Sequence, residues 1–156
     1  MDYKIFRGKF KICKNITWDQ VIDKIYYEYA TKTIRFIGND DSKVRPPTFV
    51  CENYNYLPNT IQDAWDEVHA VYENINTMHV YTSFGLDAAT AGRHRDTMDV
   101  MIVQAVGDMV YAFDTDCLDK KDEVILKPGD ALYIPKGVHH EPLGIGPRIS
   151  LSFDFK

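Results

Sequence analysis

Apolar residues recur every three to four positions in two stretches of the first half of the chain, a spacing typical of amphipathic helices. The first stretch follows Thr17, which forms a capping-box pattern with Gln20, and its apolar positions are Trp18, Val21, Ile22, Ile25 and Tyr29. The second stretch follows Thr60, and its apolar positions are Ile61, Ala64, Trp65, Val68, Tyr72 and Ile75. Each stripe predicts a helix whose apolar face packs on a sheet.

From Thr77 onward, short apolar or alternating runs separated by turn residues replace the helical spacing. These runs predict strands at residues 78–84, 93–105, 109–113, 123–126, 131–134 and 148–155, and similar runs occur earlier at 9–14, 33–37 and 48–51. Short strands with frequent turns favour an antiparallel sandwich or barrel. We therefore predict a mainly β (α+β) jelly roll with its helices outside one sheet. Residues 1–156 would form one domain, with an N-terminal elaboration at about 1–76 and a core at about 77–156.

Composition narrows the class of protein. The formal net charge of -5 gives little electrostatic support for nucleic-acid binding. Three widely spaced cysteines suit a reducing compartment. The N-terminus lacks a signal-peptide pattern, and no apolar window approaches the length of a membrane span. We expect a cytoplasmic protein with neither nucleic acid nor membrane as a partner.

Two separated segments carry candidate metal ligands. His94 and Asp96 form a His-x-Asp pair, and residues two apart on an extended strand point to the same face. His139 and His140 follow a Pro-x-Gly turn, and neighbours in a strand point oppositely, so only one of them should reach an ion. Two imidazoles and one carboxylate form the ligand set of non-haem Fe(II) oxygenases, so we predict a site for Fe(II) or another divalent metal.

The same segments carry a family resemblance. From Gly129 the spacing Gly-x5-Pro-x-Gly-x2-His resembles the second cupin motif and ends on His140. A His-x-Asp pair followed by a distant histidine is similar to the JmjC-type and related 2-oxoglutarate oxygenases of the cupin superfamily. The resemblance covers about residues 78–155. It implies a cupin-type double-stranded β-helix, metal ligands His94, Asp96 and His140, and 2-oxoglutarate as cosubstrate.

A 2-oxoglutarate enzyme also needs a cation for the far carboxylate of its cosubstrate. JmjC-type enzymes usually supply it from the hairpin after the His-x-Asp strand, but residues 107–111 contain no base. Another group of 2-oxoglutarate oxygenases uses an Arg-x-Ser pair on the last strand, which Arg148 and Ser150 resemble. Arg148 is equally well interpreted as a solvated charge at a strand end. Gln104 and Tyr81 are further candidate polar contacts of the cosubstrate.

Two functions remain open at this level. The first is an Fe(II)- and 2-oxoglutarate-dependent oxygenase, a hydroxylase. The second is a metal-binding cupin that does not use 2-oxoglutarate, such as another dioxygenase, an isomerase or a small-molecule-binding module. The substrate would be a small molecule or an exposed peptide. Cupin-type sheets often dimerise, which leaves a homodimer open.

Overall fold

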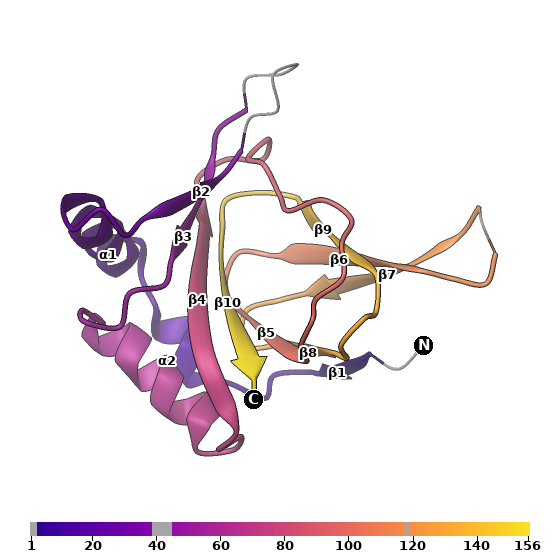
Figure 1. Ribbon diagram of the computed structural model, residues 1–156, viewed down its shortest axis with the longest axis horizontal. Coiled ribbons are helices and arrows are strands. Elements are labelled where there is room, and N and C mark those ends of the chain that lie inside the picture. The colour runs from indigo at the N-terminus through magenta and orange to yellow at the C-terminus, as the bar shows by residue number, and fades with distance from the viewer. Residues whose placement is uncertain (1–2, 39–44, 118) are drawn as a thin grey trace.

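Two antiparallel sheets face each other in the computed structural model, which describes residues 3–38, 45–117 and 119–156 (Figure 1). The large sheet has the order β1-β8-β5-β10-β4-β3-β2 and comprises β1 (Lys4–Phe6), β2 (Arg35–Ile37), β3 (Thr48–Cys51), β4 (Ile75–Ser83), β5 (Val100–Val106), β8 (Ala131–Ile134) and β10 (Arg148–Phe155). The small sheet has the order β7-β6-β9 and comprises β6 (Met109–Asp114), β7 (Lys121–Leu126) and β9 (His140–Gly144). This arrangement confirms the predicted mainly β jelly roll.

Helices cover the outer face of the large sheet, as predicted (Figure 1). They are α1 (Trp18–Ala30) and α2 (Asn59–His69), with a short 3-10 helix, η1 (Ile12–Asn15), nearby. Alternation along β10 turns Ile149, Leu151 and Phe153 outward into the core shared with the helices. The predicted stripe of α2 enters this core through Ile61, Ala64 and Val68. None of the helices in the described ranges is long and apolar enough to cross a membrane.

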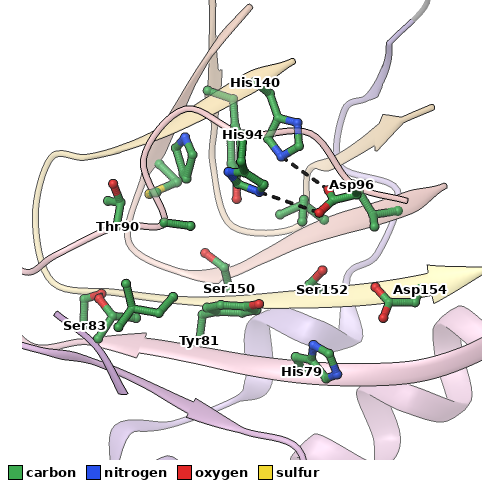
Figure 2. A pocket seen from close by; sticks show the side chains of 18 of the residues that line it. His79, Tyr81, Ser83, Thr90, His94, Asp96, His140, Ser150, Ser152 and Asp154 are labelled. Atoms are coloured by element: carbon green, nitrogen blue, oxygen red, sulfur yellow. Dashed lines mark hydrogen bonds and ion pairs between the residues drawn. The ribbon is translucent and has the colours of Figure 1, made fainter. Parts of the chain in front are cut away.

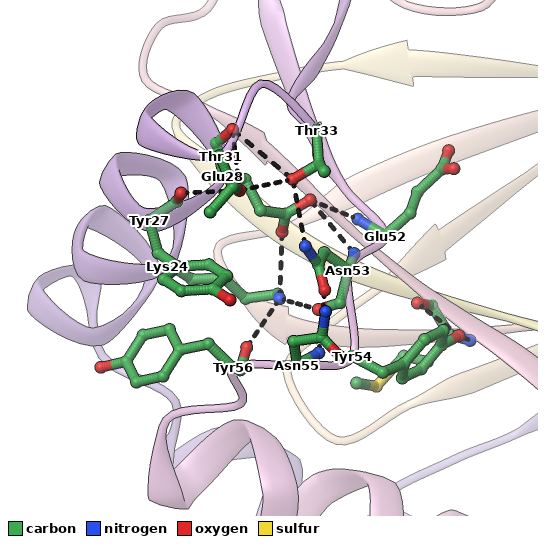
Figure 3. A network of polar contacts seen from close by, with 11 residues as sticks. Lys24, Tyr27, Glu28, Thr31, Thr33, Glu52, Asn53, Tyr54, Asn55 and Tyr56 are labelled. Atoms are coloured by element: carbon green, nitrogen blue, oxygen red, sulfur yellow. Dashed lines mark hydrogen bonds and ion pairs between the residues drawn. The ribbon is translucent and has the colours of Figure 1, made fainter.

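Helix α1 forms where predicted but buries a different face. Its buried side chains are Val21, Lys24 and Glu28, whereas Ile22 and Tyr29 are 48% and 69% exposed. The predicted stripe was therefore wrong at two positions. The physical reason is an ion pair between Lys24 and Glu28 that points into the protein. There both side chains form hydrogen bonds with the main chain of residues 52–56 (Figure 3). The side chain of the capping residue forms no hydrogen bond with the helix, so the capping box is also not realised.

The space between the two sheets is divided into a packed half and an open half. The packed half is apolar, and its buried residues are Val100, Ile102, Met109, Tyr111, Phe113, Val124, Leu126, Leu132 and Ile134. The open half contains the cavity described below, and four residues at the boundary of the packed half also line it: Val100, Ile102, Met109 and Tyr111. The packed half holds the sheets together, because apolar burial contributes about 25 cal/mol per Å², and so fixes the walls of the cavity.

Three strand predictions need correction. Residues 9–14 form no strand; the N-terminal segment instead supplies β1, which pairs with β8, followed by η1. The strand expected at 93–105 begins only at Val100. Strand β9, which begins at His140, was not predicted. The N-terminal elaboration therefore does more than cover the sheet with helices, since it also contributes β1, β2 and β3 to the large sheet.

Candidate metal and cosubstrate site

The three predicted metal ligands converge at the mouth of the open half. Nε2 of His94 lies 3.7 Å from Oδ1 of Asp96, and Nε2 of His140 lies 3.5 Å from Oδ2 of Asp96 (Figure 2). One ligand atom from each residue can be chosen so that all three lie within 4.8 Å of one another. The loop before β5 provides His94 and Asp96, and the start of β9 provides His140.

Backbone contacts, rather than a regular strand, hold the two segments together. His94 and His140 form an isolated antiparallel bridge in which each amide donates to the other carbonyl over 2.9 Å. The amide of Gly137 donates to the carbonyl of Asp96 over 3.0 Å. The regular strand that we predicted through His94 and Asp96 is therefore wrong, although the two side chains do point to one place.

Asp99 fixes the turn that precedes His140. Its carboxylate accepts hydrogen bonds from the Tyr133 hydroxyl over 2.5 Å and from the Lys136 amide over 2.8 Å. These hydrogen bonds stabilise the carboxylate and hold the pKa of Asp99 below its usual range, and the bond from Tyr133 contributes most. The turn is thus tied to the loop that carries Asp96, which limits how far the two halves of the site can separate.

Both histidines present the correct nitrogen to a metal. Nδ1 of His94 lies 2.8 Å from the carbonyl of Gly92, and Nδ1 of His140 lies 3.1 Å from the carbonyl of Val138. A carbonyl only accepts, so each Nδ1 carries the proton and each Nε2 keeps its lone pair toward Asp96. Such outer hydrogen bonds usually orient metal-ligating histidines. Burial lowers the pKa of His140 and favours the neutral form that ligates. The donor set fits Fe(II).

A cavity of about 280 Å³ extends from these ligands between the sheets. Its floor is made by two paired strands of the large sheet, in which Ser150 lies opposite Tyr81 and Ser152 lies opposite His79. Figure 2 shows this floor below the three ligands, with Ser83 near one end and Asp154 at the other. Strand alternation on β10 places Arg148, Ser150, Ser152 and Asp154 on the cavity side.

Arg148 is buried at one end of this floor, with only 3% of its surface exposed. Its guanidinium donates to the carbonyls of Gly146 over 3.0 Å and of Ala88 over 3.3 Å. Within the described ranges no carboxylate forms an ion pair with it. Burial lowers its pKa, but an arginine remains charged. The interpretation as a solvated charge at a strand end is therefore wrong.

Gly144 makes room for this guanidinium. A Cβ at Gly144 would overlap the guanidinium nitrogens of Arg148, far inside van der Waals contact. The glycine on β9 thus allows an arginine from the other sheet to cross the interior. This role was not predicted, because nothing in the chain near Gly144 signals what lies opposite.

Gln104 lies outside the cavity lining, contrary to the direct contact that we predicted. Its Nε2 donates to the carbonyls of Val106 and Gly107, both over 3.0 Å, and its Oε1 accepts the hydroxyl of Ser150 over 2.6 Å. Its role is therefore to orient Ser150. Tyr81 does line the cavity, and its hydroxyl points along the floor toward Ser152 rather than toward Ser83 (Figure 2).

Tyr111 belongs to the cavity but was not predicted there. This residue is 5% exposed, lines the cavity from β6, and has its ring 6.4 Å from the ring of His140. The sequence predicted only that Tyr111 lies in a strand, because the alternating pattern of residues 109–113 is the same as that of any strand in a core. His139 does not line the cavity, so His140 is the histidine that joins the cluster.

Comparison with known proteins gives the class of this fold. The JmjC domain profile matches residues 108–156. Among solved structures, the ribosomal oxygenase YcfD from Escherichia coli superposes with a TM-score of 0.73 at 18% identity over 99% of this chain and 47% of that chain. YcfD in complex with cobalt and 2-oxoglutarate gives the same TM-score and identity over 48% of its chain. Fe(II)-HppE with an alternative substrate superposes with a TM-score of 0.51 at 9% identity, over 80% of this chain and 57% of that chain.

These likenesses confirm the predicted resemblance: the chain has a cupin fold of the JmjC type. It spans about half of the length of the YcfD chains that it matches. A search of curated protein sequences finds no match. The structural likeness at 18% identity establishes the fold, and the chemistry has to be argued from the site.

Proposed function

We propose that this protein is an Fe(II)- and 2-oxoglutarate-dependent oxygenase. The observation that carries the proposal is Arg148, a buried cation without a carboxylate partner among the described residues, which lines the same cavity as the three candidate metal ligands. A buried charge is costly unless it is paired. A dicarboxylate that reaches from the metal to Arg148 would supply the missing partner.

Each residue has a separate task in this proposal. His94, Asp96 and His140 would hold Fe(II) and leave positions open toward the cavity. When bound, Fe(II) would supply the oxidative chemistry in which dioxygen and 2-oxoglutarate are consumed: one oxygen atom of O2 goes into the succinate that forms with loss of CO2, and the other hydroxylates a C–H bond of the substrate. Arg148 would hold the far carboxylate with charge-assisted hydrogen bonds from its planar fork. Its burial would exclude water that competes for the same anion.

The substrate would occupy the end of the floor away from Arg148. The side chains there are His79, Tyr81, Ser152 and Asp154, with Arg35 at the rim, where it pairs with Glu52. A small molecule or an exposed peptide in the cytoplasm remains our proposal for the substrate class. YcfD is described as a ribosomal oxygenase, and its likeness to this chain supports an oxygenase without specifying what this chain modifies.

The alternative is a metal-binding cupin that does not use 2-oxoglutarate. One observation favours it: β6, where JmjC-type enzymes are expected to carry the base, presents Met109 to the cavity instead. In our proposal Arg148 takes over this task from the opposite sheet.

Anaerobic addition of 2-oxoglutarate to the Fe(II)-loaded protein tests the proposal. We expect a visible metal-to-ligand charge-transfer band that saturates with 2-oxoglutarate. His94→Ala and Asp96→Ala should lose most bound metal and therefore the band while keeping the far-ultraviolet circular dichroism of the fold. If wild-type protein binds metal but neither shows the band nor binds 2-oxoglutarate calorimetrically, the alternative is correct.

A further inference from the structure

Ser150 cannot donate a hydrogen bond to a ligand in this cavity. Both hydrogens of the Gln104 amide nitrogen point at backbone carbonyls, so Oε1 of Gln104 must be the atom that faces Ser150. The hydroxyl of Ser150 lies 2.6 Å from that oxygen and has only one hydrogen to give. Toward the cavity Ser150 offers lone pairs, which a carboxylate would repel. Of the two residues of the Arg-x-Ser pair, only Arg148 can therefore donate to the far carboxylate.

Tyr111 brings a second hydroxyl to the cavity that Arg148 lines. Its side chain lines the cavity, and within the described part of the chain its hydroxyl forms no hydrogen bond. The guanidinium of Arg148 lies against Gly144, which pairs with Met109, and Tyr111 follows Met109 by two residues on the same face of β6. On its other side, the ring of Tyr111 is 6.4 Å from the ring of His140. A buried phenol normally finds a partner. An unpartnered one facing a cavity indicates a ligand that accepts its hydrogen.

Tyr81 does not compete for this role. Figure 2 shows its hydroxyl directed along the floor toward Ser152 and away from Ser83, the residue opposite Arg148 in the β4–β10 pairing. Its electrostatic partners are Arg35 and Asp154 at the mouth, together with Glu52 and Asp96. We had predicted Tyr81 as a cosubstrate contact, but its hydroxyl faces the substrate end of the cavity instead.

We infer that the hydroxyl of Tyr111 donates a hydrogen bond to the far carboxylate of 2-oxoglutarate, the same carboxylate that Arg148 binds. The anion would then be bound by one residue from each sheet. The inference rests on the proposed function. Tyr111 contributes from β6 of the small sheet and Arg148 from β10 of the large sheet. Because Met109 lies two residues before Tyr111 on the same face of β6, the strand that lacks the expected base still contributes a donor.

Tyr111→Phe tests this inference, since it removes the hydroxyl and keeps the ring that packs near His140. We would titrate 2-oxoglutarate calorimetrically into Mn(II)-loaded protein and measure Mn(II) affinity separately. A hydrogen bond to a charged group predicts about a tenfold or greater loss of 2-oxoglutarate affinity. Mn(II) affinity should stay unchanged. Tyr72→Phe, which removes a phenol bonded to Lys9 away from the cavity, should leave both affinities unchanged.

Two further titrations test whether Tyr111 acts on the far carboxylate itself. Ser150→Ala should weaken 2-oxoglutarate binding less than Tyr111→Phe does. 2-Oxobutanoate lacks the far carboxylate, so its weaker binding should be insensitive to Tyr111→Phe. Equal losses for the two oxo acids, or unchanged 2-oxoglutarate affinity in Tyr111→Phe, would overturn the inference and leave the proposed function standing. If the wild type does not bind 2-oxoglutarate at all, both the inference on Tyr111 and the proposed function are wrong.

Discussion

Among the residues that the structure describes, a lysine and an arginine are buried, and their surroundings differ. Lys24 is 1% exposed and Arg148 is 3% exposed. Nζ of Lys24 lies 3.0 Å from a carboxylate oxygen of Glu28 and donates to the carbonyls of Asn53 and Tyr56 over 2.7 and 3.0 Å (Figure 3). Arg148 has carbonyl acceptors but no anionic partner in the described part of the chain, and an open cavity lies beside it.

We interpret this difference as one between a charge that holds the fold and a charge that awaits a ligand. Oε1 of Glu28 also accepts the amides of Glu52 and Asn53, so the Lys24 pair ties α1 to the chain after β3. Lys24 has an anionic partner and two carbonyl acceptors, whereas Arg148 has carbonyl acceptors only and uses part of its five N–H groups. Residues that await a ligand are expected to be less completely bonded than residues that hold the fold.

Removing the anion from the structural pair should have the largest effect. Glu28→Gln would leave the charge of Lys24 buried without compensation, which typically costs about 3–5 kcal/mol. Urea denaturation should show this loss in the free energy of unfolding. The double variant Lys24→Met with Glu28→Gln should recover part of this loss, because it removes the uncompensated charge and keeps a side-chain oxygen that can accept from the amides of Glu52 and Asn53. A loss below about 1 kcal/mol in Glu28→Gln would contradict the comparison.

Removing Arg148 should leave the stability of the fold intact and reduce 2-oxoglutarate binding. Arg148→Met relieves an unpaired buried charge, so we expect a free energy of unfolding at least as high as that of the wild type without ligand. Its 2-oxoglutarate affinity should fall by about 1.5–3 kcal/mol, the range for a hydrogen bond to a charged group. Calorimetry on Mn(II)-loaded protein measures this loss. Clear destabilisation of ligand-free Arg148→Met would place Arg148 with Lys24 as a structural charge.

A smaller perturbation displaces Arg148 without removing it. Gly144→Ala would put a methyl group into the space of the guanidinium, which is the mobile end of its side chain and can move away. We expect 2-oxoglutarate affinity to fall by about 1 kcal/mol, within the range for overpacking and below that of Arg148→Met. Gly146→Ala is the matched control, because a Cβ there meets no atom within 4 Å. Equal affinities in the two alanine variants would show that the space at Gly144 is not needed.

The smallest effect should come from pH. Burial depresses the pKa of His140 below the ordinary value of about 6.5. The unfolded chain therefore takes up a proton first as the pH falls through that value, and the metal-free protein loses stability over the range below it. Metal affinity weakens in the same direction, since only neutral imidazole ligates. His140→Gln should flatten the acid side of a stability profile measured by thermal unfolding; an unchanged profile would contradict the assignment.

The sequence determined the class of structure and the residues of the candidate metal site. Alternating strands and two helical stripes predicted the jelly roll and its outer helices, because side-chain periodicity follows directly from backbone geometry. The His-x-Asp pair and the Gly-x5-Pro-x-Gly-x2-His spacing selected His94, Asp96 and His140, since ligands that lie close along the chain or follow a tight turn leave a local signature.

Only the tertiary structure decided how the candidate ligands meet and which groups surround Arg148. His94 reaches His140 through an isolated bridge rather than a strand, and that pairing joins segments 46 residues apart. Gln104 takes the hydrogen of Ser150 across two strands. The exposed fraction of Arg148 and the space above Gly144 depend on residues from both sheets.

The face of α1 that is buried was also decided by the tertiary structure. Apolar periodicity counts Ile22 and Tyr29 as core residues, but Lys24 and Glu28 are buried because each finds its partners in the loop after β3. Whether a charged side chain can be buried depends on atoms far along the chain that satisfy it, and this information enters only when the segments pack together.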